Sequence, residues 1–543
     1  MAARNVLFIM CDQLRWDYLS CAGHPTLETP NIDALARRGV RFTRAYVQSP
    51  VCGASRMSFY TGRYVNSHGA AWNGFPLKVG EMTLGDYLRP MGVRTALVGK
   101  THMEPDREGM ARLGIDHQSL IGVRASECGF DPYERDDGLW AQGPDGDYDG
   151  RNCAYNGYLN AKGYVGENPW HDWANSGQEQ EGLASGWAMR NAPKPARVQE
   201  DDSETPYMTR RAMDFIIEAG DAPWCLHLSY IKPHWPYIAP APYHNMYSIA
   251  DIKPVVRNQD ERRDPHPVFA EFLKQRVAQT FSRDEVREAV IPVYMGLIRQ
   301  IDDQLGILFD FLERRGAFRD TMIVFTSDHG DYLGDHWMGE KDLFHEPSVK
   351  VPLIVYDPSG ACDAMRGQIC DELVETIDLA PTFIDALSGD WRAQAHRLEG
   401  RSLMPLLRGE ALAHWRDYAI SEYDYSVSQA ATRLGLEPRD ARLFMVADKS
   451  WKYVHAIGFR PMLFDLEADP QEFVDLGADP AYEGVRARFA AALADWGLRM
   501  SQRTTLSEAE VKAMRGRSPR KGILVGVWDE AELPADMWVK YRG

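Results

Sequence analysis

Polar side chains able to bind a cation directly follow two apolar stretches of the sequence. Asp12 and Gln13 come after NVLFIMC, and Asp328 and His329 come after TMIVFTS. Carboxylate, amide and imidazole groups suit a hard or borderline divalent cation, which favours Ca²⁺ or Mn²⁺ ahead of Mg²⁺. A structural zinc site is less apt because thiolates are missing from the set. Each pair taken alone is also typical of a helix cap or a surface loop.

Three further clusters carry basic, imidazole or thiol groups. VGKTH supplies Lys100 and His102, and SYIKPH supplies Lys232 and His234. Gly-Lys-Thr resembles the end of a phosphate-binding P-loop, but that loop requires glycine at position 94, which is arginine here. In SPVCGASRMSFYTGRY, Cys52 and Arg56 stand too close together for a tyrosine-phosphatase loop, which separates cysteine and arginine by five residues.

The elements that must position these groups alternate between helices and apolar strands. TPNIDALARRG predicts a helix that starts at Pro30 and stops at Gly39, after a strand over 6–10. Helices are likewise predicted over 83–92, 205–220 and 283–315, each followed by an apolar strand. This alternation predicts an α/β fold with a mixed, mostly parallel sheet flanked by helices on both faces. The polar clusters would then meet at the carboxyl ends of the strands.

The chain divides into three predicted parts. Residues 1–400 form the large α/β domain, in which 107–204, rich in Gly, Asp, Asn and Trp, is expected to be a long insertion or lid. Short strand-like pieces and a final helix predict a small antiparallel α+β domain over 401–500. The tail over 501–543 is too apolar for a solvated terminus, which predicts an oligomer contact in a dimer or tetramer. Its large apolar residues are Trp528, Leu533, Met537, Trp538 and Tyr541.

Composition excludes several classes of function. The 543 residues are 44% hydrophobic and 26% charged, as in globular proteins, and have no apolar run long enough to span a bilayer. A net charge of −17 opposes binding to nucleic acid or to a membrane surface. Eight scattered cysteines without a CxxC pair, and an N-terminus without a signal-peptide cleavage region, predict a cytoplasmic protein without a disulfide framework.

VCGASRMSFYTGR resembles the sulfatase signature, Cys-x-Pro-Ser-Arg followed by Thr-Gly, in which the cysteine is oxidised to formylglycine. The matching residues are Cys52, Ser55, Arg56, Thr61, Gly62 and Arg63. Ala54 departs from the pattern, because the family usually has proline there. TPNIDALARRGVRF, GKTH, TSDHGDYLGDH, VPLIV, EGRSLMPLLRGE and LFDLEADPQE also resemble sulfatase segments in the family's order. The resemblance covers most of the chain and implies the alkaline phosphatase-like fold.

The resemblance also implies a role for each candidate residue. Cys52 would become formylglycine after a transient encounter with the formylglycine-generating enzyme. In the hydrate, one hydroxyl attacks sulfur and the second later loses a proton to expel sulfate. The implied metal ligands are Asp12, Gln13, Asp328 and His329; Arg56 and Lys100 would stabilise the deprotonated hydroxyl, and His102 would orient or deprotonate the hydrate. Lys341 and His234 would reach the sulfuryl and leaving oxygens, and Asn73 would contact the substrate.

Three functions follow as expectations. The first is hydrolysis of small anionic sulfate monoesters, aryl sulfates among them. The second is phosphonate monoester or phosphodiester hydrolysis, alone or beside the first. Those hydrolases resemble this chain at CDQLRWD and in the long tail, but carry small and hydroxyl residues in place of Lys100 and His102. The third is a silent metal-binding or oligomeric scaffold in which Cys52 stays a thiol, an alternative consistent with Ala54.

Overall fold

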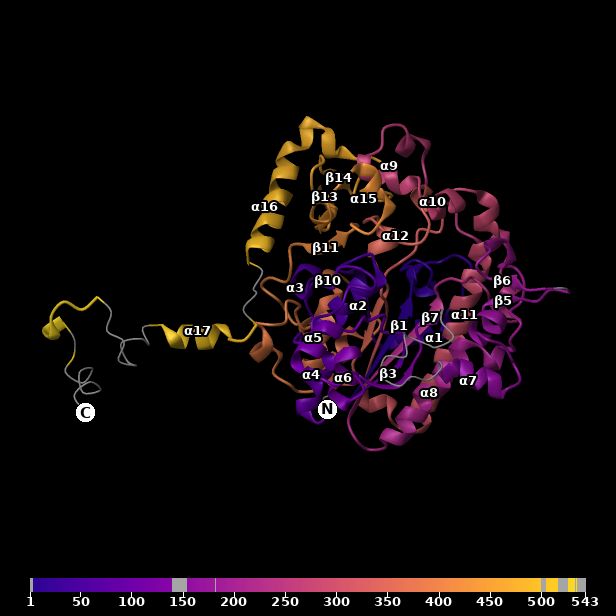
Figure 1. Ribbon diagram of the computed structural model, residues 1–543, viewed down its shortest axis with the longest axis horizontal. Helices are drawn as coiled ribbons and strands as arrows, with labels where there is room; N and C mark the ends of the chain where they lie inside the picture. The colour runs from indigo at the N-terminus through magenta and orange to yellow at the C-terminus, as the bar shows by residue number, and fades with distance from the viewer. Residues whose placement is uncertain are drawn as a thin grey trace.

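An eight-stranded sheet forms the centre of the computed structural model (Figure 1), which describes residues 3–138, 154–180, 182–499, 504–515, 526–532 and 534. Its order is β10-β2-β9-β8-β1-β7-β3-β4. The strands are β1 Asn5–Asp12, β2 Val40–Tyr46, β3 Arg94–Gly99, β4 Asp131–Arg135, β7 Trp224–Pro233, β8 Thr321–Ser327, β9 Leu353–Tyr356 and β10 Ile369–Glu375. All pairs are parallel except those of β9 with β2 and β8, which confirms the predicted mostly parallel sheet.

Helices cover both faces of this sheet because alternate side chains of each central strand point to opposite sides. In β1, Leu7 and Ile9 join one core cluster, and Val6 and Phe8 join the other. The first cluster packs against α1 (Pro30–Arg38), α8 (Glu204–Ala219) and α11 (Asp284–Arg314). The second packs against α2 (Cys52–Thr61), α4 (Leu84–Leu88) and α13 (Leu379–Ala386). The helices predicted from the sequence are thus present at nearly the expected bounds.

The region over 107–204 contains more regular structure than its weak periodicity predicts. It begins with α5 (Arg107–Leu113) and α6 (Leu120–Ser126), and β4 is the edge strand of the main sheet. β4 could not be predicted from the sequence, because its five residues are only partly buried and show no apolar run. Further along lie α7 (Ala154–Ala161) and the short pair β5 (Ser176–Gly177) and β6 (Ala184–Ser185). A lid function for this region stays a prediction.

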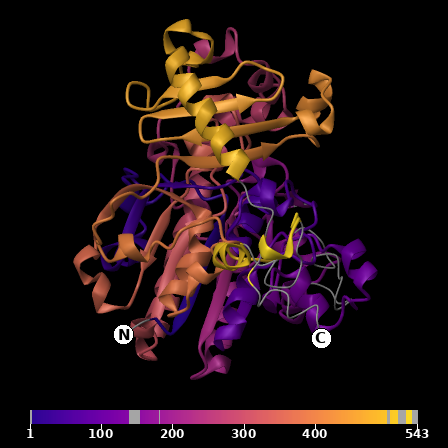
Figure 2. The ribbon, with the colours of Figure 1, turned by 90° about the vertical axis from the view of Figure 1, so that its left-hand side faces the viewer.

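A second, smaller sheet lies above the first, as Figure 2 shows. Its strands are β11 Ala419–Asp424, β12 Arg442–Ala447, β13 Trp451–Ala456 and β14 Met462–Asp465, paired antiparallel in that order. Helix α16 (Glu483–Arg499) packs on it through Phe489, which is fully buried with Tyr453 and Leu463. The predicted antiparallel α+β domain is therefore present.

The tail after this domain extends away from the body in Figure 1 and includes α17 (Glu508–Met514). Trp528 is 94% exposed, so this indole is not packed on the body of the same chain. Leu533, Met537, Trp538 and Tyr541 lie outside the described residues. The subunit interface stays a prediction.

The seven cysteines in the described part of the chain are all free thiols. Among the described residues, every helix is too short or too polar to cross a lipid bilayer.

Candidate active site

The candidate nucleophile stands at the start of a fully buried helix. Val51 is extended, α2 begins at Cys52, and Gly62 ends it in the left-handed conformation at φ 67°. All ten residues of α2 are buried. The positive end of the helix dipole therefore lies beside the Cys52 side chain and favours negative charge there.

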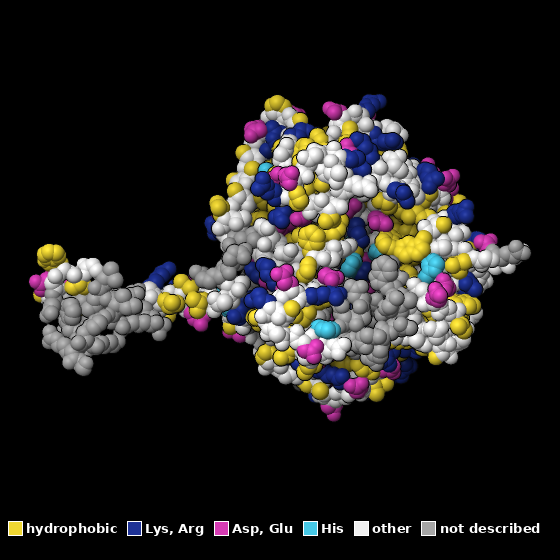
Figure 3. Space-filling view, viewed as in Figure 1, with side chains coloured by type: hydrophobic (Ala, Val, Ile, Leu, Met, Phe, Trp, Pro, Cys, Tyr) yellow, Lys and Arg dark blue, Asp and Glu magenta, His cyan; other side chains and the backbone are white. Residues whose placement is uncertain are grey.

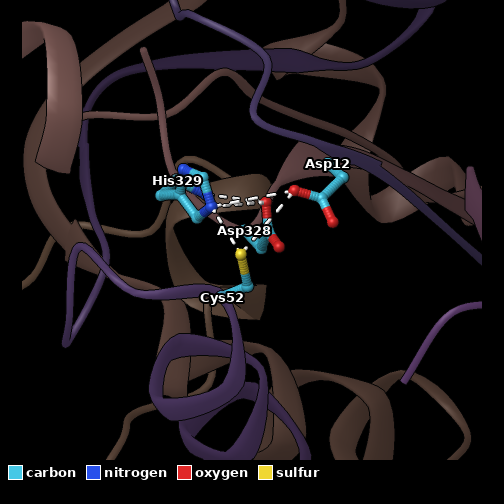
Figure 4. Close-up of side chains that lie close together, drawn as sticks. All are labelled: Asp12, Cys52, Asp328 and His329. Carbon is cyan, nitrogen blue, oxygen red and sulfur yellow. Dashed lines mark hydrogen bonds and ion pairs between the residues drawn. The ribbon is translucent and has the colours of Figure 1, made fainter. Parts of the chain in front are cut away.

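Cys52 lies with Asp12, Asp328 and His329 in one compact group, as Figure 4 shows. One ligand atom from each of the four lies within 4.8 Å of the others, and none of the four side chains is exposed. His329 Nε2 lies 3.7 Å from Asp12 Oδ1 and 3.8 Å from Asp328 Oδ1. Its Nδ1 donates to the Gly330 carbonyl at 2.8 Å, which fixes the ring with Nε2 toward the group.

Gln13 completes the donor set through an oxygen that has no partner among the described residues. Its amide nitrogen donates to Tyr237 Oη at 3.1 Å and to Asp331 Oδ2 at 2.5 Å. Its Oε1 is buried without a hydrogen-bond partner, although buried polar atoms are ordinarily paired. The main-chain N–H of Gln13 donates to Asp328 Oδ1 at 3.0 Å. Two carboxylates, an imidazole and an unpaired amide oxygen fit the predicted divalent cation.

Arg56 contacts the carboxylates of this group, whereas the sequence analysis assigns it to the nucleophile itself. Its Nε donates to Asp328 Oδ2 at 2.8 Å, and one terminal nitrogen lies 3.3 Å from Asp12 Oδ2. The other donates to the Lys100 carbonyl and to Ser229 Oγ, each at 2.8 Å. These acceptors occupy the planar guanidinium fork. Arg56 therefore positions Asp12 and Asp328, and its effect on residue 52 is electrostatic.

Cationic and imidazole groups surround the Cys52 sulfur on its other sides. Lys341 Nζ donates to Sγ at 2.9 Å, and His329 Nε2 lies 3.0 Å from it. His102 and His234 also lie close enough to the Cys52 side chain to interact with it electrostatically. Three of these residues come from segments far apart in sequence, so the fold brings together the groups that the resemblance implies.

The charges in this group set the protonation of Cys52. Burial by itself raises the pKa of the thiol, but Lys341, His329 and Lys100 outweigh it and hold the pKa well below its ordinary value. Conversely, although burial disfavours the imidazolium, Asp328 and Cys52 raise the pKa of His329 to about 9. The site is therefore built to stabilise an anion at residue 52.

Lys100 and His234 differ in charge. The Lys100 ammonium lies 2.6 Å from Asp12 Oδ2, so it reaches the group through a carboxylate. Burial lowers the pKa of His234 to about 4, so the imidazole is neutral near pH 7. Its Nδ1 lies 2.8 Å from the Trp235 carbonyl, which leaves Nε2 for the site. An anion bound beside His234 would raise its pKa and allow it to donate a proton.

Asn73 and Lys232, the two remaining polar candidates, bind protein groups. Asn73 Oδ1 accepts from the Gly53 N–H at 2.8 Å, and a side chain at position 53 would collide with that oxygen. Lys232 Nζ donates to Asn175 Oδ1 at 2.6 Å and to the Pro236 carbonyl at 3.0 Å. Lys232 thus ties the 107–204 region to the end of β7. Substrate contact by Asn73 stays a prediction.

Sequence reasoning missed the residues that orient the predicted ones. Asp331 and Tyr237 hold the Gln13 amide, and Asp331 was visible only as one more acidic residue in DHGD. The Tyr237 hydroxyl also donates to Asp331 Oδ2 at 2.9 Å. No periodic pattern marks such contacts, because each joins side chains from separate loops.

Comparison with known proteins places this geometry in a family. The sulfatase family profile matches residues 4–389, and that of the N-sulphoglucosamine sulphohydrolase C-terminal region matches 334–497. The chain therefore belongs to the sulfatase family of the alkaline phosphatase superfamily. Membership confirms the predicted class of enzyme, a sulfuric ester hydrolase.

Individual relatives extend along nearly the whole chain. The multifunctional alkaline phosphatase superfamily protein PehA of Trinickia caryophylli is 32% identical over 93% of this chain and 97% of its own. An arylsulfatase of Clostridium perfringens is 27% identical over 87% of this chain and 90% of its own. Among solved structures, a phosphonate monoester hydrolase of Silicibacter pomeroyi has a TM-score of 0.80 at 27% identity and covers 93% of this chain and 98% of its own.

Proposed function

We propose that this protein hydrolyses sulfate monoesters, including aryl sulfates, with a formylglycine made from Cys52 and one divalent cation, Ca²⁺ or Mn²⁺. The observation that carries the proposal is the surrounding of residue 52. Its side chain meets Lys341 and His329 directly and has Asp12 and Asp328 beside it. A structural thiol gains nothing from an ammonium and an imidazole at such close range, whereas a nucleophile that must become anionic does.

The cation would be held by Asp12, Gln13, Asp328 and His329, where it supplies positive charge that polarises the nucleophile and the ester. Lys341 donates to the reacting atom of residue 52 and can move to an ester oxygen as charge develops there. His102 lies near residue 52 and is placed to take or return its proton. His234 can supply a proton to the leaving oxygen once an anionic substrate has raised its pKa.

Phosphonate monoester and phosphodiester hydrolysis is the second candidate function. The similarity to a phosphonate monoester hydrolase over nearly the whole chain supports it. Lys100 and His102 favour the sulfatase reaction, because by resemblance phosphonate hydrolases carry small or hydroxyl residues at these positions. Both reactions pass through anionic transition states at one metal, so one site can serve both.

One experiment tests the proposal. Peptide mass spectrometry measures formylglycine at position 52, elemental analysis measures bound metal, and kcat/KM is determined for an aryl sulfate, a phosphonate monoester and a phosphodiester. We expect formylglycine, about one divalent ion per chain, and the highest value on the aryl sulfate. Full activity with an unmodified thiol would refute the formylglycine. Higher kcat/KM on the phosphonate would make the second candidate the main function, and an unmodified, inactive protein would support a scaffold.

A further inference from the structure

A pocket of about 970 Å³ opens directly beside the site. Its walls come from the 186–190 segment, the loop after β7, α10 (Arg276–Phe281) and the start of α11. Figure 3 shows hydrophobic side chains gathered in the middle of this face, near α10. Its lining includes Trp187, Trp235, Tyr237, Arg190, Arg276 and Glu340.

Three residues of the pocket wall adjoin the catalytic groups. Glu340 in its wall immediately precedes Lys341, which contacts the Cys52 sulfur. Trp235 follows His234, and the two rings lie 4.1 Å apart. Tyr237 donates to Asp331 and accepts from Gln13. An ester whose reacting group lies at residue 52 would therefore extend its alcohol part into this pocket.

Two tryptophans form an aromatic wall. The Trp187 and Trp235 rings lie 5.0 Å apart at 58°, and Trp187 is 49% exposed. The Trp235 indole N–H is buried and has no hydrogen-bond partner among the residues that the structure describes. Asn175 holds this wall in place, because its carbonyl accepts from the Gly186 N–H and its side chain accepts from Lys232. An exposed, anchored indole beside an apolar hollow is suited to stacking on a flat ring.

The charges of the pocket favour an anion. Arg283 is paired with Glu285 at 3.1 Å, and Glu340 adjoins the Lys341 ammonium, which offsets its charge. Arg190 and Arg276 are exposed and have no hydrogen bond or ion pair in the part of the chain that the structure describes. Guanidinium groups bind carboxylates and sulfonates through paired hydrogen bonds. Two arginines without ion-pair partners among the described residues thus line the same pocket as the two tryptophans.

We propose that this pocket receives the alcohol part of the ester, and that the preferred alcohol is an aromatic ring bearing a second anionic group, a carboxylate or sulfonate. The ring packs against Trp187 and Trp235, and Arg190 and Arg276 bind the anion. The inference rests on the proposed function for its ester chemistry. The 107–204 region would then help to select this class of substrate through its 186–190 segment.

The test compares three sulfate esters on the same enzyme preparation: 2-naphthyl sulfate, its 6-sulfonate and its 6-trimethylammonium derivative. We expect kcat/KM for the sulfonate to exceed that for the parent by about tenfold, the value of one charge-assisted interaction. The double variant Arg190→Gln/Arg276→Gln should bring kcat/KM for the sulfonate down to that for the parent, chiefly through KM. Trp187→Ala should lower kcat/KM for all three esters.

Arg112→Gln is the matched control, because Arg112 is also exposed, has no ion pair in the described part of the chain and lies outside the pocket. It should leave all three values unchanged. Equal kcat/KM for the sulfonate and the parent, or a preference for the trimethylammonium ester, would overturn the inference.

A binding measurement separates this inference from the proposed function. Calorimetric titration with 6-hydroxy-2-naphthalenesulfonate, the alcohol alone, requires no modified Cys52. Saturable binding that weakens about tenfold in the double arginine variant supports the pocket even if no sulfate ester is cleaved. Hydrolysis of 2-naphthyl sulfate without binding of this alcohol would support the sulfatase and refute the pocket.

Discussion

Two buried ionic clusters in this molecule have opposite designs. In one, Arg416 donates to both Asp378 oxygens at 2.6 and 2.7 Å and lies 3.2 Å from Glu375. Tyr64 and the Ile420 N–H bind the Glu375 carboxylate, so this cluster is closed and joins β10 to the small domain. In the catalytic cluster, Gln13 Oε1 and His102 Nδ1 are buried and have no hydrogen-bond partners in the part of the chain that the structure describes.

The pairing of buried polar atoms distinguishes a structural charge cluster from a functional one. Both bury charges, and in each the neighbouring anions raise the pKa of the basic group against the lowering effect of burial. A cluster that serves stability pairs its polar atoms, because each buried unpaired atom costs about 1–3 kcal/mol. A cluster that binds a ligand keeps atoms unpaired for it. The predictions below test this contrast.

The largest expected effect is at the nucleophile. Cys52→Ala should lower kcat/KM by about 10⁴-fold or more and change the free energy of unfolding by about 1 kcal/mol or less. Cys128→Ala, which removes another buried thiol in contact with Met103, should leave kcat/KM unchanged. Activity assays and thermal unfolding measure the two effects. Retained turnover in Cys52→Ala would contradict the assignment of the nucleophile.

Removal of one carboxylate from the open cluster should cost metal and activity together. Asp328→Asn should lower metal affinity and kcat/KM by about 100-fold, because a ligand is lost as well as an acceptor for Arg56. Asp302→Asn is the control, since buried Asp302 caps α1 through Asn31 and Ile32. Normal metal content and rate in Asp328→Asn would show that the four-ligand set is wrong.

The closed cluster should respond in stability alone. Arg416→Met leaves Asp378 and Glu375 buried without their cation and should lower the free energy of unfolding by about 3–5 kcal/mol. The folded fraction should keep its kcat/KM. Arg499→Met removes an exposed ion pair with Asp495 and should change stability by about 0.5 kcal/mol or less. Denaturant unfolding with parallel assays checks both, and a selective fall in kcat would refute the separation of the clusters.

Lys100 and His102 should distinguish the two candidate reactions by a smaller factor. Lys100→Ala and His102→Ala should reduce kcat/KM on both an aryl sulfate and a phosphonate monoester. The loss on the sulfate should be the greater by about tenfold, because phosphonate hydrolases work with hydroxyl residues at these positions. Equal losses would show general activation of the nucleophile, and a greater loss on the phosphonate would reverse the ranking.

The smallest effect on either cluster should come from the tail. Truncation before Ile523 should lower the oligomeric state in light scattering, because exposed Trp528 and the apolar residues after it are expected to contact another copy. The kcat/KM for a small aryl sulfate should change by about twofold or less. An unchanged mass per particle, or a monomeric parent, would refute the interface.

The positions of the two metal-binding carboxylates could be predicted from the sequence for a physical reason. Asp12 and Asp328 follow parallel neighbouring strands, β1 and β8, whose carboxyl ends coincide. The half-exposed edge strand β4 was missed because its residues are not patterned.

Side-chain connections between loops were equally invisible. The hydrogen bond between Gln13 and Asp331 joins residues 318 positions apart in the sequence. The one between Lys232 and Asn175 joins residues 57 positions apart. Arg56 contacts Asp12 and Asp328, and its assignment to the nucleophile stays a prediction, because motif spacing identifies a residue without showing which of its neighbours lies closer.

The burial of α2 bears on how the enzyme is made. Cys52 has no exposed surface, and the whole of its helix is enclosed. A maturation enzyme must bind the segment around Cys52 while that segment is accessible. In the folded protein it is not accessible. If Cys52 is converted as proposed, the oxidation has to happen before the domain closes, in a race between modification and folding. Chains that fold before Cys52 is modified keep the thiol permanently. The active fraction of a preparation is therefore set during synthesis, and adding metal afterwards would not raise it.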